Sequence, residues 1–354
     1  MDDQLNSSYD VVVIGGGAAG LSAALALGRA RRSVLVIDAG APRNAPAGHV
    51  HNYLGREGAS PGDLLAAGRA EVASYGGRVV TGTVVSAERL ESLSLESMGL
   101  ESRSGGSTDG GPADGARFRA VLADGRLVRA RRLLMTTGLV DELPDVPGVG
   151  ERWGRDVLHC PYCHGWEVRD QAIGILATGP MAVHQTLMFR QLSPDVTLFL
   201  HTGPAPSEEE REQLDARGIA CIEGEVAALE VTDDQLTGVR LRSGQLFPRQ
   251  AVVVAPRFSA RAEMLTSLGL ETTEMLMGDY VMGSYIAADP MGATAVPGVW
   301  VAGNVADLRA QVISSAAAGL NSGAAINADL IAEDTADAVA AHRARRVQEV
   351  GAGQ

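Results

Sequence analysis

The chain has 354 residues, 45% of them hydrophobic and 21% charged, and its net charge is −13. This length is sufficient for two domains with cores of their own. The acidic balance argues against a nucleic acid or an anionic membrane as partner, because both are bound through basic patches. The first eight residues lack the basic and apolar regions of a signal peptide, and no apolar run reaches the about eighteen residues of a membrane span, so we expect a cytoplasmic protein.

A βαβ unit is predicted at the N-terminus. Residues 9–14 form an apolar, β-branched run that is typical of a buried strand, and a helix of small residues follows over 18–30. A second buried strand over 33–37 ends at Asp38. This order of elements is the start of a nucleotide-binding α/β fold.

A G-x-G-x-x-G motif connects the first strand to the helix. Gly15 permits the tight turn, Gly17 lets the backbone approach a pyrophosphate, and Gly20 allows the helix to pack closely on the strand. The free N–H groups of the helix N-terminus face the phosphates, and Asp38 can accept a hydrogen bond from a ribose hydroxyl. The residues predicted to contact the nucleotide here are Gly15, Gly17, Ala18, Ala19, Gly20, Asp38 and Ala39.

The composition changes to Ser, Gly, Glu and Asp between residues 91 and 117. Such a segment buries little apolar surface, which predicts a flexible surface insertion rather than a domain boundary. Residues 118–134 that follow are predicted to form a hairpin that turns at Asp124-Gly125.

The chain has three cysteines, and two of them form the motif Cys160-Pro161-Tyr162-Cys163. Cysteines at this spacing can close an easily reduced disulfide, and a neighbouring cation or helix N-terminus can lower the pKa of one thiol. The alternative is half of a zinc site completed by His159, His164, His201 or Cys221. No second CxxC or paired-histidine motif accompanies it, so the redox interpretation is favoured and no metal is expected.

A second βαβ unit is predicted in the middle of the chain. A strand begins at Ala172, a helix covers about 180–191, and a second strand covers 196–200. Further strands are predicted at 223–231, 236–241 and 251–255. The repeated order predicts an α/β protein with two Rossmann-like, three-layer nucleotide-binding domains.

Two later segments extend the first site. Thr136-Thr137-Gly138 ends one strand, and residues 299–304 end another that is followed by a helix of small residues over about 311–330. Residues 294–304, TAVPGVWVAGN, resemble the T-x-x-P-G-[VI]-[FY]-A-x-G-D segment of the thioredoxin-reductase-like FAD-dependent disulfide oxidoreductases. The resemblance extends over nearly the whole chain apart from the insertion and the tail.

This resemblance implies FAD as the cofactor and a homodimer as the assembly. Asn304, which stands where the family has Asp, would bind the ribityl chain, and the backbone of Gln311 and Val312 would meet the flavin ring. The further residues expected to contact FAD are Thr137, Gly138 and Gly303.

The family also implies that the second domain is inserted into the first and carries the cysteine pair at its start. The expected boundaries are 1–148 and 258–335 for the two parts of the FAD-binding domain, 149–257 for the inserted domain, and 336–354 for a C-terminal tail.

The resemblance assigns different roles to the two cysteines. Cys163 would face the flavin, and Cys160 would exchange with the substrate. His164 stands where thioredoxin reductases carry an acid/base Asp, and an imidazole that titrates near neutrality can take a proton from a thiol; the alternative is a surface histidine without a role. The sequence leaves open whether His49 and His51, in the loop after Asp38, lie near the flavin.

The second glycine turn departs from the motif of family members that use NADPH. It reads Ala177-Thr178-Gly179-Pro180-Met181-Ala182, so the first glycine is replaced and Pro180 removes a backbone N–H. The segment 201–207 after the next strand offers neither an Arg cluster for a 2′-phosphate nor an acidic residue for a ribose. We expect the fold to persist and nicotinamide binding to be lost.

A CxxCH motif beside a degenerate nicotinamide turn resembles the dithiol oxidases of the gliotoxin and holomycin pathways. The resemblance implies that a small dithiol is converted to an intramolecular disulfide and that oxygen reoxidises the flavin. The main alternative is an NADPH-dependent thioredoxin reductase with a thioredoxin-like protein as partner. A flavin monooxygenase would have no use for the cysteine pair, and a non-enzymatic redox or zinc module would not bind flavin.

Overall fold

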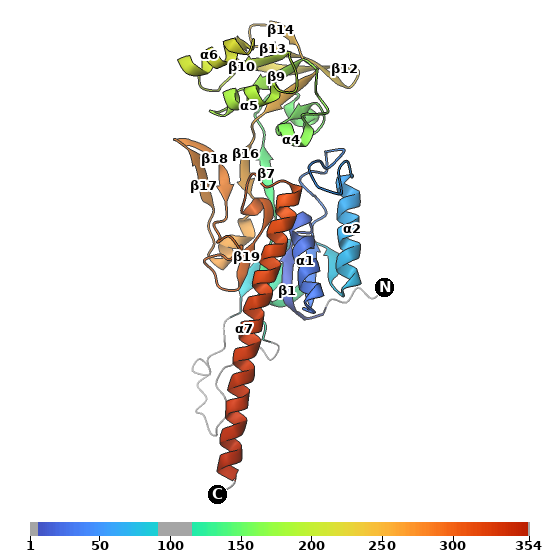
Figure 1. Ribbon diagram of the computed structural model, residues 1–354, viewed down its shortest axis with the longest axis vertical. Helices are drawn as coiled ribbons and strands as arrows, with labels where there is room; N and C mark the ends of the chain where they lie inside the picture. Colours follow the sequence, from blue (N-terminus) through green and yellow to red (C-terminus); the bar gives the residue numbers. More distant parts are fainter. Residues whose placement is uncertain (1–5, 91–114, 353–354) are drawn as a thin grey trace.

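The computed structural model describes residues 6–90 and 115–352, so most of the predicted insertion lies outside the described residues. Two α/β units follow each other along the long axis of the molecule, and a long C-terminal helix extends from the opposite end (Figure 1). The chain leaves the first unit, builds the second, and returns to complete the first with its last strand and helix. The predicted insertion of one Rossmann-like unit into the other is confirmed.

The sheet of the first unit has the order β3-β2-β1-β6-β5-β4, with β19 beside β6. Strands β1, β2, β6 and β19 are parallel to one another. Their segments 11–14, 34–37, 133–135 and 299–301 are buried, which explains why these segments are continuously apolar. The predicted hairpin over 118–134 is the antiparallel pair β5–β6. The bounds are β1 Ser8–Ile14, β2 Val34–Asp38, β3 Arg78–Thr81, β4 Val84–Arg89, β5 Phe118–Leu122, β6 Leu127–Met135 and β19 Val299–Val301.

Three helices cover one face of this sheet, α1 (Ala18–Arg29), α2 (Pro61–Ser74) and α7 (Val312–Ala352). Helices α1 and α7 approach closely because α7 presents glycine at the crossing. A Cβ atom on Gly319 would lie 2.0 Å from the carbonyl oxygen of Ala19. The other face packs against the short helix η2 (Glu263–Leu268).

Helix α7 is continuous from Val312 to Ala352, so it includes the segment from Glu333 onward, whose composition is helical. Its middle is fixed to β6 by ion pairs: the nearly buried Arg132 binds Asp329 at 2.5 Å and also Glu333, and Arg131 binds Asp334 at 2.5 Å. Among the described helices, this long one included, none has the length and apolar character that a membrane crossing requires.

The second unit is built on a parallel sheet of order β11-β10-β9-β15-β8. Helices α5 and α6 cover one face, whereas the small antiparallel sheet β12-β13-β14 covers the other, so the third layer is β structure. The bounds are α3 Val149–Arg152, β8 Val157–Leu158, α4 Pro161–His164, β9 Ile173–Leu176, α5 Ala182–Phe189, β10 Val196–Phe199, α6 Glu208–Ala216, β11 Ala220–Ile222, β12 Val226–Thr232, β13 Gln235–Leu241, β14 Leu246–Pro248 and β15 Ala251–Val254.

Two antiparallel strands carry the chain between the units, β7 (Leu139–Glu142) outward and β16 (Arg257–Ala260) back. A hairpin, β17 (Thr273–Met277) and β18 (Tyr280–Tyr285), extends this pair to a four-stranded sheet. The hairpin lies beside the connection between the two units (Figure 1).

The α1–α7 crossing can be tested with two glycine substitutions. Gly319→Ala is expected to lower the free energy of unfolding by about 1–3 kcal/mol, because the new methyl group has no room. Gly62→Ala in α2 is the matched control, since its nearest neighbour would be the Ser60 hydroxyl at 3.9 Å, and it is expected to leave stability unchanged or slightly raised. Chemical denaturation measures both, and equal stability of the two variants would contradict the packing.

Candidate active site

The cysteine pair lies at the start of the short helix α4. Cys160 is the N-cap residue, and Pro161 takes the first helical position, where a missing N–H is tolerated. The backbone N–H groups of Cys163 and His164 donate to the carbonyl of Cys160 at 3.2 and 3.1 Å. This turn brings the two sulfur atoms together: the Cys163 thiol donates to Sγ of Cys160 at 2.7 Å.

The two thiols differ in acidity. The hydrogen bond from Cys163 lowers the pKa of Cys160 to about 7, and the backbone N–H groups of Cys163 and Tyr162 act in the same direction against the effect of burial. The same hydrogen bond, together with burial, raises the pKa of Cys163 above its ordinary value. In the reduced pair, Cys160 therefore carries the thiolate and Cys163 stabilises it.

Arg43 is the cation of the site, and its role was not predicted. Its guanidinium forms a bidentate ion pair with the carboxylate of Asp141 at 2.6 and 2.8 Å. The guanidinium also lies over the ring of Phe258 and donates to Oδ1 of Asn304 at 3.4 Å. Its charge contributes to lowering the pKa of Cys160 and opposes the increase in the pKa of Cys163. No local motif marks Arg43, because its partners come from distant parts of the chain.

His164 follows Cys163 directly and is half-buried. Burial lowers its pKa, with the carboxylate of Glu167 opposing this and His51 and His49 adding to it. Nε2 of His164 is buried and has no hydrogen-bond partner in the structure. A neutral imidazole with an unpaired ring nitrogen is suited to accept a proton.

The loop after β2 reaches α4, as Figure 1 shows. Nδ2 of Asn52 donates to the carbonyl of Tyr162 at 2.6 Å, inside the cysteine motif. Nδ1 of His51 lies in hydrogen-bond contact with the carboxylate of Glu57 at 2.6 Å, and its Nε2 lies 3.4 Å from the carboxylate of Glu167. The sequence left the surroundings of His51 open, and the structure brings this histidine to the α4 side of the site.

The first glycine turn has the shape of a pyrophosphate site. Gly15 has a φ of 113°, and a Cβ there would lie 2.3 Å from the carbonyl oxygen of Thr136. A Cβ on Gly20 would lie 2.0 Å from the carbonyl oxygen of Gly15, so both positions require glycine. At Gly17, by contrast, no atom lies within 4 Å of the Cβ position, which leaves the open approach to the N-terminus of α1 that a phosphate needs. Ala18 and Ala19 form the first turn of that helix.

The other predicted cofactor residues line the same end of the sheet. Asp38 ends β2 and is bound by Arg69 at 2.7 Å, with Ala39 exposed beside it. The hydroxyl of Thr137 donates to the carbonyl of Arg261, and Gly138 follows with a φ of 73°. Gly303, Asn304, Gln311 and Val312 follow β19 and lead into α7.

Asn304 occurs in place of the family's aspartate for a local reason. Its amide Nδ2 donates to the backbone carbonyls of Asp307 and Ala310 at 3.0 and 2.9 Å. A carboxylate could not make these two donations. Its Oδ1 stays available as an acceptor and faces Arg43.

Comparison with known proteins gives the family. A family model described as pyridine nucleotide-disulphide oxidoreductase matches residues 9–323. The chain belongs to this family. It is an oxidoreductase with FAD as cofactor, as predicted, and the non-enzymatic alternative is excluded. The residues around the first glycine turn fit that cofactor.

Relatives match over almost the full length. Thioredoxin reductase sirT of Leptosphaeria maculans is 30% identical over 93% of this chain and 97% of its own length. Thioredoxin reductase aclD of Aspergillus oryzae is 27% identical over 84% and 88%. The crystal structure of HlmI is 45% identical with a TM-score of 0.82, covering 96% of this chain and 97% of that chain. An oxidoreductase from Agrobacterium tumefaciens is 32% identical with a TM-score of 0.78, covering 92% and 99%.

The second glycine turn is held by its own neighbours. Ala177, which replaces the first glycine of the motif, packs against Gly203: a Cβ on Gly203 would lie 2.8 Å from that of Ala177. The N–H of Gly203 donates to the carbonyl of Ala177 at 2.9 Å. Nδ1 of His201 accepts from the N–H of Val226 at 3.0 Å, so this histidine supports the loop.

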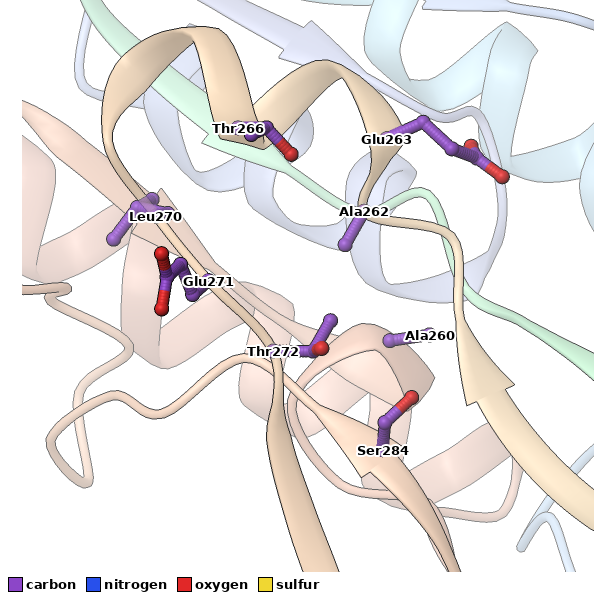
Figure 2. Close-up of a pocket in the computed structure, with 8 residues that line it drawn as sticks. All are labelled: Ala260, Ala262, Glu263, Thr266, Leu270, Glu271, Thr272 and Ser284. Carbon is purple, nitrogen blue, oxygen red and sulfur yellow. The ribbon is translucent and has the colours of Figure 1, made fainter.

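A separate cavity of about 500 Å³ lies beside η2 and β18 (Figure 2). Its lining includes two carboxylates, Glu263 and Glu271, and none of the cysteine or predicted cofactor residues. Among the described residues, no three His, Cys, Asp or Glu side chains gather as metal ligands do. Cys221 lies on β11, an element separate from α4 and distant from it in the sequence.

The acidity of Cys160 can be tested by removing its hydrogen-bond donor. In Cys163→Ala the pKa of Cys160 is expected to rise from about 7 toward the ordinary value of 9.0. Alkylation of Cys160 by iodoacetamide at pH 7, followed by mass spectrometry, should then slow by about fiftyfold, since the thiolate fraction falls from about one half to about one per cent. Cys163→Ser keeps a hydroxyl donor and serves as the control. An unchanged rate in Cys163→Ala would contradict the assignment.

Proposed function

We propose that this flavoenzyme oxidises a small-molecule dithiol to an intramolecular disulfide, with oxygen as the final electron acceptor. One observation carries the proposal. The cysteine pair and the first glycine turn have the features that thiol oxidation on FAD needs, whereas the second glycine turn lacks those that nicotinamide binding needs. Electrons would therefore enter from thiols.

The reaction starts from the oxidised Cys160–Cys163 pair. A substrate thiolate attacks Sγ of Cys160, a mixed disulfide forms, and the Cys160–Cys163 bond breaks. The second thiolate of the substrate then attacks the substrate sulfur of the mixed disulfide. The intramolecular product disulfide forms and leaves, and Cys160 departs as a thiolate. Its low pKa makes it the better leaving group of the pair. Cys160 and Cys163 would then return to the disulfide, and bound FAD would supply the redox chemistry that passes their two electrons, with the two protons of the substrate thiols, to oxygen as hydrogen peroxide.

The surface beside the cysteine motif suits an apolar substrate. Tyr162, inside the motif, and Trp166, which follows it closely, are each 66% exposed, and Leu54 in the facing loop is 93% exposed. Exposed aromatic side chains near a reactive thiol offer stacking and apolar contact to a compact ring system.

A second candidate is an NADPH-dependent reductase of a thioredoxin-like protein. The observation that favours it is the name thioredoxin reductase carried by relatives such as sirT and aclD. The homodimer implied by the family resemblance, the cytoplasmic location and the domain boundaries given above stay predictions.

An anaerobic reduction experiment separates the two candidates. Oxidised flavins absorb at about 450 nm, and this band is followed after adding dithiothreitol to one sample and NADPH to another. The dithiol is expected to bleach the band within seconds, and NADPH is expected to leave it. Admission of oxygen should restore the band with release of hydrogen peroxide. Rapid bleaching by NADPH would establish the reductase instead.

His164 is proposed as the base that accepts the proton of the attacking thiol. His164→Gln is expected to slow flavin reduction by dithiothreitol about a hundredfold at pH 7, the size typical of a lost general base. The deficit should disappear above about pH 9, where the substrate is already a thiolate. A rate loss of the same size at every pH would indicate a structural role and contradict the assignment.

A further inference from the structure

The β17–β18 hairpin carries a tyrosine onto the second glycine turn. The hydroxyl of Tyr280, the first residue of β18, donates to the carbonyl of Thr178 at 3.4 Å. A Cβ built on Gly179 would lie 2.7 Å from Cζ, 2.8 Å from Oη and 3.1 Å from Cε1 of that tyrosine. The ring therefore rests directly on the backbone of Gly179, and Gly179 is buried.

This contact falls at the position that matters for a nucleotide. In a G-x-G-x-x-G turn the second glycine is the one whose missing side chain lets a pyrophosphate approach the backbone. In the sequence ATGPMA that glycine is Gly179. The space that a glycine leaves for phosphate is taken here by an aromatic ring from a part of the chain about a hundred residues away.

The tyrosine lies at the tight turn of the hairpin. Met277 and Tyr280 pair across its end, and Gly278 adopts a φ of 57° in the two-residue turn between them. The other turn residue is Asp279.

We propose that Tyr280 is a specificity-determining residue that fills the pyrophosphate position of the second glycine turn and thereby excludes nicotinamide nucleotides. The inference rests on the proposed function, because it explains why electrons enter from thiols. The loss of the nucleotide site is then due to a side chain that occupies it as well as to the altered turn sequence.

A double-mutant cycle tests whether the ring lies on the turn in solution. Gly179→Ala is expected to lower Tm by several degrees, because the added methyl group meets Tyr280. In a Tyr280→Ala background the same substitution should have little effect. Additive effects of the two substitutions would overturn the proposal.

Nucleotide binding tests the exclusion itself. Titration of the FAD-loaded protein with NADPH, and separately with ADP, is followed by calorimetry. Tyr280→Ala is expected to tighten the binding of both nucleotides by about tenfold or more, and a tenfold gain in affinity is 1.4 kcal/mol. Tyr280→Phe, which keeps the ring, should bind both nucleotides as weakly as the wild type. Leu276→Ala, a 58% exposed residue of the same hairpin, is the matched control. Unchanged affinity in a Tyr280→Ala protein that retains FAD would overturn the proposal.

The two hypotheses fail in different ways. If NADPH binds and reduces the wild-type flavin, both the dithiol oxidase and the exclusion are wrong. If dithiothreitol oxidation proceeds as proposed but Tyr280→Ala gains no affinity, only the role of Tyr280 is wrong.

Discussion

The ion pair between Arg43 and Asp141 is the contact on which the site depends. The Asp141 side chain is only 9% exposed, and a carboxylate so removed from water requires a cationic partner. Arg43 satisfies it and at the same time contacts Phe258 on the returning strand β16 and Asn304 beyond β19. One guanidinium thus joins the loop after β2, both connecting strands and the cofactor segment, and its charge acts on the cysteine pair.

The proposed electron and proton transfers involve different groups of the site. The hydrogen bond between the two sulfur atoms lowers the pKa of Cys160 and raises the pKa of Cys163, so the thiolate of the reduced pair is on Cys160. Burial lowers the pKa of the adjacent His164, the residue proposed to accept the proton of the attacking thiol. Of the two carboxylates beside His51, Glu57 is 65% exposed and Glu167 is 39% exposed.

The inserted unit shows why a nucleotide-binding fold can persist after its ligand site has changed. Its parallel sheet is held by apolar clusters on both faces, and the glycine turn contributes only Ala177 and Ala182 to them. Stability therefore depends on the sheet, while binding depends on a few backbone positions at its edge. A side chain from the β17–β18 hairpin can occupy that edge without disturbing the core.

The sequence by itself determined the two βαβ units, the glycine turn for FAD, the hairpin over 118–134 and the cysteine pair, because each is encoded by residues close together in the chain. Only the tertiary structure decided the partners of these motifs. Arg43 meets Asp141, His51 meets Glu167, and Tyr280 meets Gly179 through contacts between segments about a hundred residues apart, which no local periodicity encodes. The ion pairs that join α7 to β6 were likewise decided by the tertiary structure, whereas the helical composition of the segment from Glu333 onward can be read from the sequence.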